Sequence, residues 1–143
     1  MQQLGSERLT TSTMAHEEMN VGIRGLMEVI MHVVDMDAMV SFYRDKLGLK
    51  LSYPTNAQNF SKENWVTFDT GSCIFVLHSG GRVRMGEQPS HRVTFQVKDV
   101  RIAREHFVKL GVQLGEVRSP APGVSVVDGK DPEGNVYALE SHS

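Results

Sequence analysis

The sequence predicts an α+β fold of paired β-α-β-β-β modules that form a curved mixed sheet around a concave cavity. Three observations support this prediction. Two segments, residues 26–34 and 92–97, alternate polar and apolar side chains as strands do. Each is followed by an aspartate and then by apolar residues at helical spacing. The strands and their aspartates recur at an offset of about 64 residues, which indicates an internal repeat.

The first module begins with the strand at residues 26–34, where alternate residues from Met27 to Val33 share one apolar face. Asp35 is expected to cap the following helix, and Gly48 is expected to end it. Three further strands complete the module, at residues 49–53, 65–69 and 72–78, the last two joined by a turn at Thr70-Gly71.

The second module repeats this order from its first strand at residues 92–97. Asp99 is the expected helix cap, and Gly111 is the expected end of the helix. The remaining strands are predicted at residues 112–117, 123–128 and 135–140. The last two form a hairpin around Asp131-Pro132-Glu133-Gly134, where proline and glycine suit a tight turn.

The chain divides into a flexible N-terminal extension and one domain. Residues 1–24 lack a firm period and form the predicted extension. The domain, residues 25–143, comprises module one (26–78), a glycine-containing linker (79–91) and module two (92–140). The helices are expected to cover the apolar faces of the strands, so the opposite, mixed faces should line the cavity and carry the function.

Composition excludes several classes of function. The net charge of −2 gives no electrostatic basis for binding nucleic acid or an anionic membrane. No stretch is long and apolar enough to span a bilayer, and no apolar block of a signal peptide is present near the start. A single cysteine, Cys73, excludes an internal disulfide. A cytoplasmic location is therefore expected.

Three motifs in order resemble those of the glyoxalase/bleomycin-resistance (vicinal oxygen chelate) superfamily. The resemblance covers residues 26–140, and the three motifs fall within the detected repeat. The motifs are Val33-Val34-Asp35 with Ser41-Phe42-Tyr43-Arg44-Asp45-Lys46-Leu47-Gly48-Leu49, then Asp69-Thr70-Gly71 with Leu77-His78, and finally Lys130-Asp131-Pro132-Glu133-Gly134-Asn135 with Leu139-Glu140.

The resemblance implies four metal-ligand positions, and this chain carries one donor among them. The positions correspond to Glu28, Val76, Arg92 and Ala138. Valine and alanine have no donor, and arginine is a fixed cation. We therefore expect no metal and no other cofactor. As an alternative, Glu28 with His78 and Glu140 could form a displaced divalent-metal site or an acid–base set.

Seven residues are candidates for the site. Glu28 is the candidate for a catalytic role, and Arg92 is expected to face it and bind an anionic or carbonyl oxygen. A structural ion pair is the alternative for these two. The other five are expected to contact ligand, with structural or solvent-exposed roles as their alternatives: His78, Glu140, Thr94, His32 and Trp65.

Two functions from different classes fit these features. The first is binding of a small organic molecule in the cavity without a metal, as in bleomycin-binding proteins. The second is a metal-dependent lyase or isomerase of the glyoxalase I or epimerase type, which would use the displaced set. An interaction module is a third possibility, so the sequence leaves open whether the chain is an enzyme. The resemblance and the open sheet edges imply a homodimer.

Overall fold

The computed structural model describes residue 22 and residues 26–82 and 92–143. The predicted extension at residues 1–24 lies outside the described residues apart from Gly22, as does most of the predicted linker. The elements, in chain order, are β1 (Glu28–Val33), α2 (Met36–Val40), the π-helical segment η1 (Ser41–Lys46), β2 (Lys50–Tyr53), β3 (Trp65–Asp69), β4 (Ile74–Ser79), β5 (Val93–Gln96), α3 (Val100–Lys109), β6 (Arg118–Ala121), β7 (Val124–Lys130) and β8 (Val136–His142).

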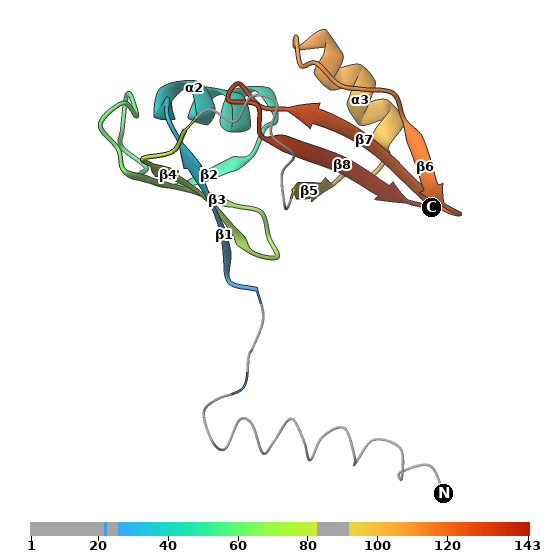
Figure 1. The fold of residues 1–143 in the computed structure, drawn as a ribbon, viewed down its shortest axis with the longest axis horizontal. Helices are drawn as coiled ribbons and strands as arrows, with labels where there is room; N and C mark the ends of the chain where they lie inside the picture. Colours follow the sequence, from blue (N-terminus) through green and yellow to red (C-terminus); the bar gives the residue numbers. More distant parts are fainter. Residues whose placement is uncertain (1–21, 23–25, 83–91) are drawn as a thin grey trace, which may run out of the picture.

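Each module builds one four-stranded mixed sheet. The first sheet has the strand order β1-β4-β3-β2, and the second has the order β5-β8-β7-β6. In both sheets the first strand runs parallel to the last strand of its module, and the other pairs are antiparallel. The two sheets lie next to each other with the helices α2 and α3 along one side (Figure 1). This confirms the predicted fold of paired β-α-β-β-β modules.

The prediction of a strand at residues 112–117 is wrong. The second strand of this module is β6, further along the chain, and Leu114 makes an isolated bridge with Gly129. β6 contains Pro120, which has no N–H to donate to a ladder. Because β6 lies at the edge of the sheet and meets β7 in an irregular register, proline is tolerated there.

Both helical segments begin as the sequence predicts. The Asp35 carboxylate accepts a hydrogen bond from the Ala38 N–H at 3.0 Å. The Asp99 carboxylate accepts hydrogen bonds from the N–H groups of the first turn of α3. The first helical segment ends before Gly48, whose φ of 78° suits glycine. In the described ranges, no helix is long and apolar enough to cross a membrane.

One hydrophobic core runs through both modules. It contains buried residues from the first helical segment, from the first sheet and from the second sheet. Aromatic contacts join the modules directly, since the ring centroids of Phe75 and Phe95 lie 5.9 Å apart. Those of Phe42 and Tyr137 lie 5.7 Å apart. The helices and this core therefore cover one face of the strands and leave the opposite face, called here the open face, without a helical layer.

A polar contact from the last hairpin also joins the modules. The buried Glu133 carboxylate accepts hydrogen bonds from the backbone N–H groups of Val34, at 2.7 Å, and Asp35, at 2.8 Å. These N–H groups lie where β1 ends and α2 begins. Beside it, the buried Asp131 carboxylate accepts a hydrogen bond from the Tyr43 hydroxyl at 2.8 Å. The hairpin therefore contacts the first helical segment at its start and again at Tyr43 in η1.

Burial keeps two core tyrosines protonated. Desolvation, followed by the nearby Asp131 carboxylate, raises the pKa of Tyr43 far above its usual range. The same two causes raise the pKa of Tyr137 to about 12. The Tyr43 hydroxyl uses its proton to bond Asp131, whereas the Tyr137 hydroxyl has no hydrogen-bond partner among the described residues. The two hydroxyls should therefore contribute differently to stability.

Replacing Glu133 with alanine is expected to lower the free energy of unfolding by about 3 kcal/mol, because hydrogen bonds to a charged acceptor each contribute about 1.5–3 kcal/mol. Urea denaturation measures the change. Glu105→Ala is the matched control, since that glutamate is 73% exposed on α3 and pairs with Lys109 within one helix. The control should change stability by less than about 0.5 kcal/mol. Equal losses for the two variants would show that Glu133 does not link the modules.

Tyr43→Phe and Tyr137→Phe form a second matched pair. The first removes the donor to a buried carboxylate and should cost about 1–3 kcal/mol. The second removes a buried hydroxyl without a partner, so stability should stay the same or rise. Thermal unfolding of both variants tests this, and a larger loss for Tyr137→Phe than for Tyr43→Phe would contradict it.

Candidate functional site

Strand alternation places the predicted site residues on the open faces of both sheets. On the first sheet, parallel pairing of β1 with β4 sets Glu28 beside Ile74 and His32 beside His78. On the second sheet, Thr94 of β5 lies beside Ala138 of β8, which in turn lies beside Asp128 of β7. The next residues on this face, two positions along each strand, are Gln96, Glu140 and Val126.

Three predicted residues form an aromatic cluster on the first sheet. The ring centroids of His32 and His78 are 5.0 Å apart, and those of Trp65 and His78 are 5.5 Å apart. His78 Nδ1 lies 2.6 Å from the backbone carbonyl oxygen of Ser79. Because a carbonyl oxygen only accepts, Nδ1 carries the proton and Nε2 is left as a possible acceptor. Trp65 thus lies on the open face, whereas a core position was its alternative.

The register separates Glu28 from His78. His78 is the strand neighbour of His32, four residues along β1 from Glu28, which corresponds to about 13 Å. The displaced set of Glu28, His78 and Glu140 does not form: within the part of the chain that the structure describes, no three His, Cys, Asp or Glu residues gather as metal ligands do. Strand register, which alternation alone does not determine, brings His78 to His32 and away from Glu28.

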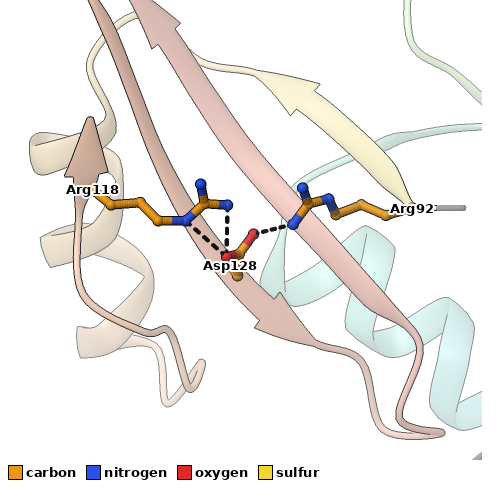
Figure 2. A network of polar contacts seen from close by, with 3 residues as sticks. All are labelled: Arg92, Arg118 and Asp128. Carbon is orange, nitrogen blue, oxygen red and sulfur yellow. Dashed lines mark hydrogen bonds and ion pairs between the residues drawn. The ribbon is translucent and has the colours of Figure 1, made fainter. Parts of the chain in front are cut away.

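Arg92 has a different partner from the one predicted. Its Nη1 lies 2.8 Å from Oδ1 of Asp128, and Figure 2 shows the arginine reaching over the neighbouring strand to that carboxylate. Arg118, at the start of β6, approaches the same carboxylate from the other side, with Nη2 2.9 Å from Oδ2. Among the described residues, no ion pair joins Arg92 to Glu28. The predicted pair is therefore replaced by an Arg92–Asp128–Arg118 network within the second sheet.

The four positions that correspond to the family's metal ligands do not fit a metal ion. Val76 is 0% exposed and Ala138 is 1% exposed, and neither side chain has a donor atom. Arg92 is a cation engaged with Asp128. Glu28 is then the one remaining donor, and divalent-metal sites in proteins need several. These four positions therefore do not supply the ligand set of a divalent-metal site.

A hollow of about 510 Å³ opens on the same face of the second sheet. Two predicted residues, Thr94 and Glu140, line it. Glu140 Oε1 lies 2.5 Å from His142 Nε2, so the hollow holds an imidazole beside a carboxylate. The complete lining is Thr94, Gln96, Val97, Lys98, Glu140 and His142. The hollow thus belongs to the second sheet and the residues that follow β5.

Sequence reasoning missed three residues of this face: Asp128, Arg118 and His142. Alternation along residues 124–130 puts Asp128 on the open face, which was a usable signal. Arg118 was assigned to no strand, because the strand was predicted to end before it. His142 lies beyond the last predicted strand, residues 135–140, yet it is the last residue of β8. The partner of Arg92 lies on β7, two strands away in the sheet. This neighbourhood is set by the pairing of strands that are far apart in the sequence.

Comparison with solved structures shows the same fold in proteins of three kinds. Lactoylglutathione lyase from Agrobacterium tumefaciens is 23% identical with a TM-score of 0.63, over 84% of this chain and 95% of that chain. The fosfomycin resistance protein FosX from Listeria monocytogenes is 17% identical with a TM-score of 0.66, over 85% and 96%. TnmS3, an antibiotic binding protein from Streptomyces sp. CB03234, is 19% identical with a TM-score of 0.67, over 85% and 98%.

The family assignment comes from the sequence itself. No curated protein matches the chain. The model of one family, however, matches residues 25–139, from before β1 into β8. The motifs predicted this family, and the paired modules have its fold. The chain belongs to the Glyoxalase/Bleomycin resistance protein/Dioxygenase superfamily.

Proposed function

We propose that the chain binds a small organic molecule on the open face of its second sheet and does so without a metal ion. The observation that carries this proposal is the donor set at the four family positions, where two buried apolar side chains and an ion-paired arginine replace ligands. The hollow beside them has the volume of a small-molecule site. Thr94, Gln96 and Glu140 supply polar groups that can orient a ligand there.

The similar structures support a small-molecule role. One of them is an antibiotic binding protein, and another is a fosfomycin resistance protein. At 17–19% identity these structures show a shared fold, and their ligands do not identify the ligand of this chain. A lyase is also among them, but the residues proposed for a metal-dependent reaction here are dispersed. Binding is therefore the function that the residues favour. We place it in the cytoplasm, because a chain with one cysteine has no internal disulfide that needs an oxidising compartment.

We also propose a homodimer. Several apolar side chains near β1 are exposed: Leu26 at 71%, Met27 at 77%, Ile30 at 41% and Ile74 at 38%. Ile30 and Ile74 lie on the open face of the first sheet. β1 is also an edge strand, and exposed apolar edges favour association.

The purified protein is expected to lack a stoichiometric divalent metal, because the four family positions offer one donor. Elemental analysis after purification without chelator or a nickel column tests this expectation. One tightly held ion per chain would refute metal-free binding and revive the lyase or isomerase alternative.

The hollow itself is tested by thermal-shift screening of small neutral and anionic compounds, followed by titration of a hit. Thr94→Ala should weaken that hit by about tenfold, the cost of one lost polar contact. Thr67→Ala is the matched control, because it removes the same hydroxyl from the open face of the first sheet. If no compound shifts the melting temperature, the binding function is wrong; if both variants bind equally, the hollow is not the site.

Light scattering at micromolar concentration should give twice the chain mass of 15.9 kDa. Ile74→Lys should shift the protein toward the monomer, since it places a charge in the exposed apolar surface. A wild-type mass equal to one chain contradicts the dimer.

A further inference from the structure

Resting on the proposed function, we propose that the ligand carries an oxyanion group, a carboxylate, phosphate or phosphonate, and that Arg92 and Arg118 bind this group. Figure 2 shows the two guanidinium groups on either side of Asp128, aimed at one another across the open face. They come from opposite edges of the sheet, Arg92 immediately before β5 and Arg118 from β6. Strand pairing therefore holds the bases of both side chains in place.

The local charge favours an anion. Two guanidinium groups share one carboxylate, so the network carries a net positive charge. Lys130 lies two residues after Asp128 on the same face and is exposed. The nearest carboxylate in the adjoining hollow, Glu140, is in contact with His142. An incoming anion thus meets an excess of cationic groups.

Both arginines keep donors available. A guanidinium offers about five N–H donors in a planar fork. Arg92 uses one of them on Asp128, through Nη1, and Arg118 uses its Nε and Nη2. The described residues supply no other partners for either group. The remaining N–H groups can bind the two oxygens of a carboxylate or phosphate in the bidentate way that arginine favours.

The network is accessible and adds little to the stability of the fold. The side chains of Arg92, Arg118 and Asp128 are 43%, 45% and 38% exposed. Ion pairs exposed to this extent contribute about 0–1 kcal/mol each. Asp128 instead fixes the spacing of two like charges that would otherwise repel each other. A prearranged pair of donors loses less conformational entropy when a ligand binds.

The network adjoins the hollow, so one ligand can occupy both. Thr94, which lines the hollow, lies two residues after Arg92 on the same face. Ala138 lies between Thr94 and Asp128 in the sheet. Because its side chain is a single methyl group, a ligand can pass over it from the hollow to the network. The organic part of the ligand lies in the hollow, and its oxyanion lies over the arginines.

The test titrates full-length protein with benzoate, phenylphosphonate and inorganic phosphate at constant ionic strength, with benzamide as the neutral counterpart of benzoate. Signals of the Arg92 and Arg118 Nε–H groups are followed by NMR. Saturable shifts are expected with at least one anion and not with benzamide, with a Kd in about the millimolar range or tighter. Comparing the anions distinguishes a carboxylate from a phosphate or phosphonate ligand.

Arg92→Ala and Arg118→Ala should each weaken that anion by about tenfold or more. Arg44→Ala is the matched control, because Arg44 forms a similarly exposed pair with one aspartate, Asp45, at 2.8 Å. Equal weakening by the control, unchanged binding in both test variants, or no saturable shift with any anion would overturn the inference. A neutral screening hit that requires Thr94 would still support the proposed function in that case, whereas absence of any hit would reject the proposed function itself.

Discussion

The arrangement of the modules depends on the Glu133 carboxylate, which accepts hydrogen bonds from two backbone N–H groups. The carboxylate belongs to the last hairpin of the second module, and the N–H groups belong to the turn between β1 and α2. These donors lie at the start of a helix, where they lack partners in the helix itself. Asp131 in the same hairpin accepts a hydrogen bond from Tyr43, so two buried acids of one hairpin hold the first helical segment at two points. Aromatic contacts in the shared core also join the two modules.

This arrangement separates stability from the chemistry of the open faces. The helices and core lie on one side of the strands, and the other side carries the aromatic cluster of the first sheet and the arginine network of the second. Val76 and Ala138 occupy metal-ligand positions of the family without a donor, and the sheets around them keep regular pairing. The fold thus tolerates different side chains on this face, in agreement with the 17–19% identity between this chain and two structures of the same fold.

Local physical chemistry accounts for what could be predicted from the sequence. Helix caps at Asp35 and Asp99, and the turn at residues 131–134, depend on neighbours within a few positions, and all three were predicted correctly. The partners of the site residues depend on strand register, which alternation does not determine. Pairing of β1 with β4 therefore placed His78 beside His32 and away from Glu28. The Arg92–Asp128 ion pair likewise depends on strand pairing, because β8 lies between β5 and β7 and sets their register.

The replacement of a metal position by arginine has a chemical consequence. A metal ion can polarise a bound oxygen and lower the pKa of bound water, whereas a guanidinium offers directional hydrogen bonds and a permanent charge. Glu28, the remaining carboxylate of the four family positions, lies on the other sheet and forms no ion pair among the described residues. In the proposed binding mode the two arginines held by Asp128 recognise the anion, and Thr94, which lines the hollow next to Arg92, helps to select the rest of the ligand.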